Sequence, residues 1–207
     1  MFLTDGPEDA AITYAFAHGA GGAMDTPFMT MVARALGERG IRVVRFEFPY
    51  MAARRTGGKR GAPDRPAVLL ETFREVVAKL GGGERVFIGG KSMGGRMATM
   101  VADELAVRGV VCFGYPFHPP GQAAKVRTSH LETLATPMLV LQGERDPFGN
   151  REDVATYTLS PSIRLAWIPD GDHSLKPRAK SGTTENQNLV LAVDLAAAFM
   201  SRRVPPA

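Results

Sequence analysis

The sequence has one cysteine, Cys112, and no apolar run long enough to cross a bilayer. A lone cysteine cannot form an internal disulfide, which suits a reducing compartment. A membrane-spanning helix needs roughly 20 consecutive apolar residues, so an integral membrane protein of that kind is excluded. The first seven residues lack the basic and apolar regions of a secretion signal. We therefore expect a cytoplasmic protein with no membrane partner.

The sequence also has little excess of positive over negative charge, since the net charge is only +4 over 207 residues. A small basic excess without a recognition motif or interleaved aromatic residues disfavours nucleic acid as a partner. Hydrophobic residues make up 44% and charged residues 22%, which excludes a disordered chain. The length fits one domain over residues 1–207, with an ordered core over about 10–200.

Short apolar runs alternate with amphipathic segments along the chain. The runs predict strands at Ile12–Ala17, Ile41–Phe48, Arg85–Ile88, Val110–Phe113, Met138–Leu141 and Ile163–Ile168. Helical periodicity predicts helices that begin at Pro27, Pro66 and near Thr184, the last with Gln187 in a capping box. Most of the strands are apolar on both faces, as in a sheet that helices cover on both sides. The alternation predicts an α/β fold with a mostly parallel sheet.

Residues 90–94 read Gly-Lys-Ser-Met-Gly and stand between a predicted strand and a helical segment. This strand–turn–helix context is typical of a nucleophile elbow, in which small residues allow the tight turn that presents Ser92. A serine hydroxyl is a weak nucleophile unless a base accepts its proton and a third group orients that base. Elbow hydrolases place these partners in the order serine, acid, histidine. Asp146 and His173 follow the last two predicted strands in this order and are the expected acid and base.

Other polar residues near these strand ends compete for roles. Glu144 is the alternative to Asp146 as the acid, whereas Asp170 and Asp172 share the loop of His173 and favour turn formation. Tyr115 and His118 follow the fourth strand and are candidates for contact with substrate. His118 precedes the acid in the chain, which disfavours it as the base.

A glycine-rich turn, residues 18–22, follows the first predicted strand. Glycines allow backbone N–H groups to approach a substrate oxygen, so the N–H groups of Ala20 and Met93 are the expected oxyanion donors. His18 and Gly19 are candidates for contact with substrate. The turn does not spell a dinucleotide or phosphate-loop motif, and no cysteine–histidine cluster has metal-ligand spacing. Acyl transfer to water needs no cofactor, and none is expected.

Residues 54–65 carry five positive charges and one negative charge. This basic loop follows the second predicted strand, which places it at the same sheet edge as the candidate triad. Arg54 and Arg55 could attract an anionic substrate or an acidic partner. A solvated loop without a ligand is the competing interpretation.

Four segments of the chain are similar to one small family of the alpha/beta-hydrolase superfamily. They are Gly89–Arg96, Gly114–Gly121, Gln142–Gly149 and Gly171–Arg178. That family holds bacterial predicted hydrolases and the hydrolase-like domains of a testis-expressed protein and of a chromatin-acetyltransferase-complex subunit. It is related to dienelactone hydrolases. The resemblance spans about residues 12–200 and implies a three-layer sandwich without a lid and a Ser92–Asp146–His173 triad.

The residues and the resemblance together favour a serine hydrolase that acts on a small-molecule carboxylic ester or thioester, with anionic substrates among the candidates. A peptidase with the same triad is a close variant. The alternative from another class is a non-catalytic interaction module that binds an acidic partner through the basic loop. The acyl group, the leaving group and the oligomeric state stay open.

Overall fold

The computed structural model describes residues 1–58 and 61–202, and its core is one seven-stranded sheet in the order β1-β3-β2-β4-β5-β6-β7. The strands are β1 (Phe2–Asp5), β2 (Thr13–Ala17), β3 (Arg42–Phe46), β4 (Val86–Lys91), β5 (Gly109–Phe113), β6 (Met138–Gly143) and β7 (Ile163–Ile168). All neighbouring pairs are parallel except β1 and β3, which are antiparallel. The predicted α/β fold with a mostly parallel sheet is confirmed.

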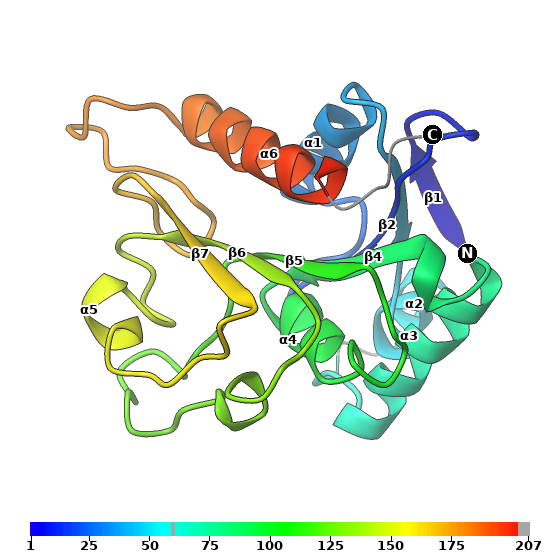
Figure 1. Cartoon of the computed structure of the whole chain (residues 1–207), viewed down its shortest axis with the longest axis horizontal. Coiled ribbons are helices and arrows are strands. Elements are labelled where there is room, and N and C mark those ends of the chain that lie inside the picture. The colour runs from blue at the N-terminus through cyan, green and yellow to red at the C-terminus, as the bar shows by residue number, and fades with distance from the viewer. Residues whose placement is uncertain (59–60, 203–207) are drawn as a thin grey trace.

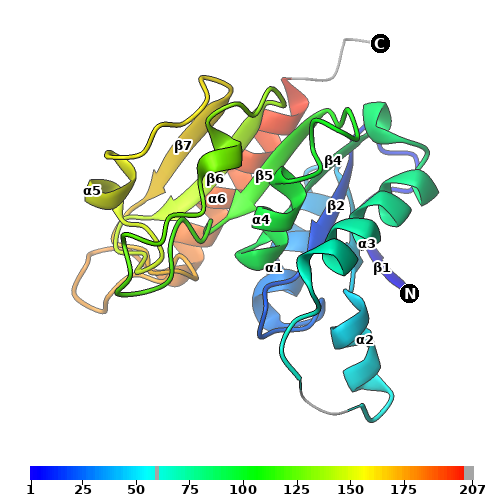
Figure 2. The same ribbon diagram turned by 90° about the horizontal axis from the view of Figure 1, so that it is seen from below.

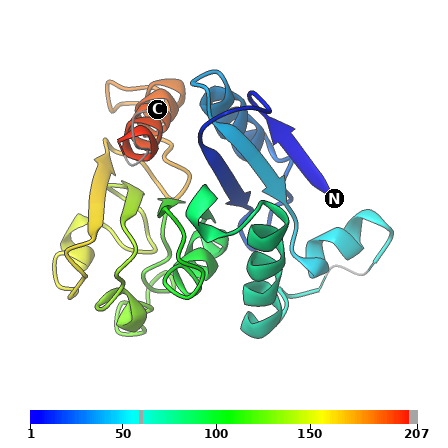
Figure 3. The same ribbon diagram turned by 45° about the vertical axis from the view of Figure 1, so that its right-hand side comes forward.

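Helices cover both faces of this sheet (Figures 1 and 3). The helices are α1 (Pro27–Gly37), α2 (Pro49–Arg55), α3 (Pro66–Lys79), α4 (Met93–Thr99), α5 (Arg151–Val154) and α6 (Glu185–Ser201). Helices α1 and α6 lie on one face, and α3 and α4 lie side by side on the other (Figure 2). Each face has its own apolar core, so the molecule has the three layers of an α/β sandwich. In the described part of the chain, no helix is both long and apolar enough to span a membrane.

The helix starts follow the predicted signals. Pro27 and Pro66 occupy first-turn positions of α1 and α3, where the N–H that proline lacks would have no partner in the helix. At α6, Thr184 Oγ1 accepts from Gln187 N, and Gln187 Oε1 accepts from Thr184 N at 2.8 Å. This is the predicted capping box, which satisfies two backbone donors at once.

Two elements depart from the sequence prediction. Strand β1 had no predicted counterpart, and it is fixed by the ion pair of Asp5 with the buried Arg45 of β3 (2.7 Å). The predicted basic loop begins as helix α2, so that Arg54 and Arg55 belong to its last turn rather than to a loop. Lys59 and Arg60 of that loop lie outside the described residues.

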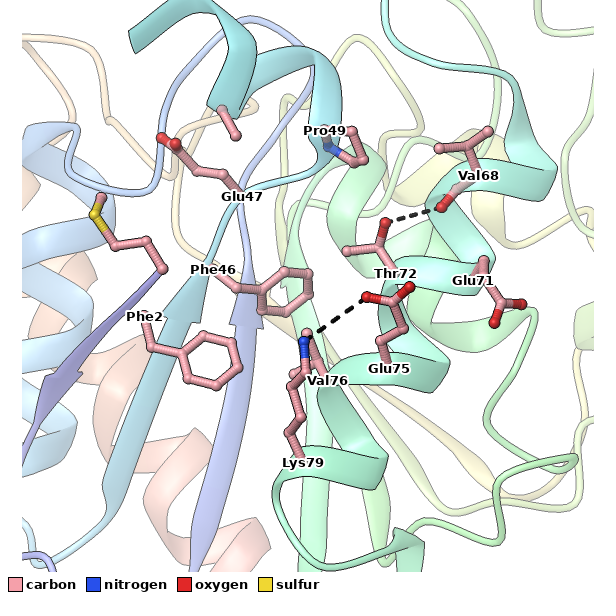
Figure 4. Close-up of a pocket in the computed structure, with 12 residues that line it drawn as sticks. Phe2, Phe46, Glu47, Pro49, Val68, Glu71, Thr72, Glu75, Val76 and Lys79 are labelled. Atoms are coloured by element: carbon pink, nitrogen blue, oxygen red, sulfur yellow. Dashed lines mark hydrogen bonds and ion pairs between the residues drawn. The ribbon is translucent and has the colours of Figure 1, made fainter. Parts of the chain in front are cut away.

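A groove of about 380 Å³ lies between the β1–β3 edge of the sheet and helix α3 (Figure 4). Phe2 and Phe46 form its floor, and the ion pair of Lys79 with Glu75 (3.9 Å) lies along the α3 side. No residue of the candidate triad lines it. The groove is therefore a feature of the sheet edge, separate from the site described below.

Candidate active site

The turn between β4 and α4 holds Ser92 in a backbone conformation that non-glycine residues rarely adopt (φ 52°, ψ −116°). The neighbouring glycines allow this turn. A Cβ on Gly90 would lie 2.4 Å from the Ala17 carbonyl oxygen, and one on Gly94 would lie 2.6 Å from the same oxygen. Because only hydrogen fits at both positions, the end of β2 packs directly against the turn. The local strain is of the kind that persists at functional sites.

Three side chains from three strand ends meet at this turn in a continuous hydrogen-bonded chain. Ser92 Oγ lies 2.8 Å from His173 Nε2, and His173 Nδ1 lies 2.8 Å from Asp146 Oδ2. Asp146 is fully buried, whereas 21% of the His173 side chain is exposed. The structure thus brings together the three residues named from the sequence, with the imidazole between the hydroxyl and the carboxylate. The imidazole of His173 is therefore accessible from solvent.

Both oxygens of Asp146 are fixed by further donors. Gln142 Nε2 donates to Oδ2 at 2.9 Å, and the backbone N–H of Phe148 donates to Oδ1 at 2.8 Å. Gln142 is itself fully buried and bonds the backbone of Tyr115 and Gly149. Donors of this kind hold the carboxylate in one orientation. Sequence analysis did not single out Gln142, although a polar residue that ends the apolar run of β6 is a signal that could have done so.

The imidazole of His173 lies between an aromatic ring and a glycine. The Phe148 ring lies 4.1 Å from it, centroid to centroid. At Gly114 (φ 67°), a Cβ would lie 2.7 Å from the His173 carbonyl oxygen and 3.2 Å from Nδ1. Burial lowers the pKa of His173 below its usual value, and the charge of Lys91 adds to this effect, against the opposing hydrogen bond of Asp146. The neutral form, which can accept a proton, is thereby favoured at neutral pH.

Lys91 precedes the nucleophile and was not singled out as a functional residue by its sequence. Its ammonium donates to the backbone carbonyl of His173 and lies 5.7 Å from the centroid of the Phe28 ring. Burial lowers the pKa of Lys91 to about 8, partly offset by the charge of Asp146. The side chain therefore ties the histidine loop to the strand that carries Ser92.

In the pH profile of kcat/KM, Lys91→Met is expected to raise the midpoint of the acid limb. It is also expected to lower kcat/KM at pH 7 roughly tenfold, because one charge-assisted hydrogen bond is lost. With a pKa of about 8, Lys91 is charged throughout the range in which His173 titrates. That charge lowers the pKa of His173, so its removal lets the histidine stay protonated, and inactive as a base, to higher pH.

The measurement is the pH profile of both proteins from pH 4.5 to 8. The matched control is Lys176→Met, in the same histidine loop, where an exposed lysine pairs with Glu185 at 3.4 Å. Its profile should overlay that of the wild type. An unshifted midpoint in folded Lys91→Met would contradict the charge effect.

The glycine-rich turn after β2 lies against the nucleophile. A Cβ on Gly19 would lie 3.7 Å from Ser92 Cβ, and Ala20 is exposed beside it. Tyr50 of α2 donates its hydroxyl to the Ala20 carbonyl at 2.8 Å and fixes the turn. The fully buried His18 accepts from the Phe48 N–H through Nε2 (3.1 Å), and its Nδ1 lies 2.7 Å from the Gly19 carbonyl. His18 therefore shapes the turn with both ring nitrogens occupied.

Tyr115 and His118, the other candidates for contact with substrate, belong to the loop that follows β5, and both side chains are buried. The Tyr115 hydroxyl donates to the Arg127 carbonyl at 3.1 Å. His118 Nε2 lies 3.2 Å from Asp153 Oδ2. Contact of either side chain with a substrate stays a prediction.

Most of the basic side chains that the structure describes in and near α2 already have partners. Arg55 pairs with Glu47 at 2.7 Å and with Asp25 at 2.8 Å, and these two carboxylates raise its pKa. Arg54 lies over the Tyr50 ring, 5.2 Å from its centroid, and donates to the Gly61 carbonyl. The charge that the sequence places here is thus partly compensated within the fold.

The competing acids have other contacts. Glu144 accepts from Arg151 at 2.8 Å and from the Asp170 N–H at 3.0 Å. Asp170 pairs with Arg178, and Asp172 Oδ1 accepts backbone N–H bonds within its own loop. These are the turn-forming contacts expected of both aspartates, and they leave Asp146 as the carboxylate bonded to His173.

A protein-family model and several solved structures match almost the full length of the chain. A family model described as an alpha/beta hydrolase domain matches residues 10–201. A lidless α/β serine hydrolase from Xanthomonas campestris superposes with a TM-score of 0.70 at 22% identity, covering 100% of this chain and 90% of that one. A dienelactone hydrolase from Anabaena variabilis gives 0.70 at 23% identity, covering 97% and 90%. Est1E from Butyrivibrio proteoclasticus, solved with ferulic acid, gives 0.71 at 16%, covering 100% and 96%. These structures share the fold of the chain along almost its full length.

Proposed function

Because the chain belongs to the alpha/beta hydrolase family, we propose that it is a serine hydrolase that cleaves a carboxylic ester or thioester through an acyl-enzyme. The observation that carries this proposal is the hydrogen-bonded chain from Ser92 through His173 to Asp146, with 2.8 Å at both steps. Nucleophile and base within this reach, with the base oriented by a third group, are the requirements for activating a serine.

In the first half-reaction, Ser92 Oγ attacks the substrate carbonyl carbon while its proton passes to His173 Nε2. The imidazolium that forms is stabilised by Asp146, which accepts from Nδ1 and stays ionised. When the tetrahedral intermediate collapses, the bond to the leaving group breaks. His173 returns the proton to the departing alcohol or thiol, and the acyl group stays on Ser92.

In the second half-reaction, water takes the place of the alcohol. His173 accepts a proton from the water as its oxygen attacks the acyl carbon, and the proton then returns to Ser92 Oγ as the acid leaves. Atoms balance without a cofactor. A single histidine serves as base and acid in each half because an imidazole readily takes up and releases a proton near neutral pH.

The oxyanion of both intermediates is assigned to two backbone donors, the N–H groups of Ala20 and Met93. Met93 opens helix α4, where the first N–H groups have no partner in the helix and the dipole favours negative charge. For the Ala20 donor, the hydrogen bond from the Tyr50 hydroxyl to the Ala20 carbonyl holds the turn beside Ser92. Loss of one such donor typically costs about a hundredfold or more in kcat.

The test is labelling with a fluorophosphonate, which reacts only with an activated serine. We expect stoichiometric labelling of the folded protein, with the phosphonylated peptide mapped by mass spectrometry to Ser92. A 4-nitrophenyl ester series of increasing acyl length should then show saturable turnover. Labelling at another residue, or none in a folded sample, would overturn the proposal.

A further inference from the structure

Two arginines, one in helix α4 and one in the loop after β5, have no acidic partner in the described residues. Arg96 is the basic residue of the last turn of the short helix α4, and its N–H donates to the Ser92 carbonyl at 3.0 Å. The two residues are four positions apart, about 6 Å along a helix axis. Helical side chains lean toward the helix N-terminus, so the Arg96 side chain leans toward the end of α4 that carries Ser92.

The second arginine, Arg127, comes from the loop after β5 and is tied to α4 by a chain of hydrogen bonds. Its carbonyl accepts from the Tyr115 hydroxyl at 3.1 Å, and this hydroxyl lies 3.4 Å from His130 Nε2. The same Nε2 lies 2.9 Å from Thr99 Oγ1, which donates to the Arg96 carbonyl at 2.7 Å. The network holds the backbones of the two arginines in a fixed relation.

The charges of this arginine pair are uncompensated in the described residues. No carboxylate there forms an ion pair with either guanidinium, in contrast to Arg55 and Arg45. Burial and the charge of Arg96 both lower the pKa of Arg127, which places the two cations within each other's field. Two like charges held together destabilise the site unless an anion lies between or beside them.

Arg96 also has unused hydrogen-bonding capacity. Its Nε is buried without an acceptor in the described structure, and a buried donor without a partner costs free energy. Its two outer nitrogens are neither buried nor bonded to the described part of the protein, so they are open to a ligand. A guanidinium presents its N–H groups as a planar fork that matches a carboxylate.

We propose that Arg96 and Arg127 bind a carboxylate of the substrate, which makes this site selective for esters or thioesters with an acidic group a few atoms from the scissile carbonyl. The inference rests on the proposed function and adds the substrate class. It assigns anion binding to arginines of α4 and of the loop after β5. The basic loop is less suited to this role because Arg55 already has two carboxylate partners.

The test compares two esters of equal length that differ by one charge, mono-4-nitrophenyl adipate and its methyl ester. The wild type should have the higher kcat/KM for the anionic ester. Arg96→Met and Arg127→Met should each lower the ratio of the two kcat/KM values about tenfold or more, chiefly through KM, because a charge-assisted hydrogen bond is lost. Equal ratios in wild type and both variants would overturn the assignment.

The matched control is Arg74→Met on α3, where a half-buried arginine pairs with Glu104 at 2.7 Å. It removes the same charge elsewhere and should keep the ratio. Arg96→Gln and Arg127→Gln provide second variants if the methionine variants unfold, as judged by circular dichroism and thermal unfolding.

A binding measurement separates failure of this inference from failure of the proposed function. Monomethyl adipate is titrated by calorimetry into Ser92→Ala and into Ser92→Ala/Arg96→Met, which lack the proposed nucleophile and leave the ester intact. A Kd at least tenfold higher in the double variant supports the carboxylate site even if neither ester is hydrolysed. Equal affinity in the two proteins overturns the site even if Ser92 is an active nucleophile.

Discussion

Ser92→Ala is expected to lower kcat for ester hydrolysis by about 10⁶-fold, the loss typical of removing a triad serine. No other hydroxyl in the described residues is bonded to His173, so nothing replaces the Oγ that attacks the carbonyl. Alanine keeps the Cβ and therefore the same backbone restriction at φ 52°. The fold and the thermal unfolding midpoint should change little.

The measurement is kcat with a saturating 4-nitrophenyl ester, together with thermal unfolding. Ser201→Ala, at the exposed end of α6, is the control for serine loss without effect on turnover. Turnover of Ser92→Ala within tenfold of the wild type would place the nucleophile elsewhere. A residual rate about 10³-fold above the uncatalysed hydrolysis in water would agree with the proposal, since the oxyanion donors and substrate binding persist.

Asp146→Asn is expected to lower kcat by about 10⁴-fold while leaving the shape of the site intact. Both oxygens of Asp146 accept hydrogen bonds, Oδ1 from the Phe148 N–H and Oδ2 from Gln142 and His173. If the asparagine oxygen accepts from Phe148, its NH₂ group faces His173 Nδ1. The imidazole must then carry its proton on Nε2, where it cannot accept the proton of Ser92.

The reverse orientation places the NH₂ group against the Phe148 N–H, so either rotamer leaves donors opposed in a buried site. The check is kcat from pH 5 to 9, with fluorophosphonate labelling slowed in parallel. Asp194→Asn, an exposed aspartate paired with Arg39, should behave as the wild type. Full activity of Asp146→Asn would show that another group orients the histidine.

Much of the fold could be read from the sequence because buried parallel strands are apolar on both faces and stand out as runs. Ile163–Ile168 was predicted with the observed bounds of β7, and the other five predicted strands differ from theirs by one to three residues at an end. Strand β1 was not foreseen, since its four residues alternate exposed and half-buried positions at the sheet edge. Its pairing depends on Arg45, 40 positions away, which no local pattern shows.

In the candidate site too, the residues that belong to a motif could be predicted, whereas those defined by their contacts could not. Ser92, Asp146 and His173 stand at strand ends, where topology alone brings them to one edge of the sheet. Gln142 and Lys91 act through hydrogen bonds that depend on rotamers and on loops far apart in sequence. The sequence of the basic loop does not show which of its charges are paired for the same reason, since the carboxylates that pair with Arg55 come from other segments.

Gly114 has a consequence for interpreting related chains. With no side chain, it leaves the space that the imidazole of His173 occupies, and any Cβ would stand 2.7 Å from the carbonyl oxygen of that histidine. A relative could thus keep serine, aspartate and histidine and still be a pseudoenzyme if this glycine were replaced. A residue outside the proposed chemistry is therefore as diagnostic of a competent site as the three residues proposed to carry it, and surveys that score only the triad would miscount such relatives.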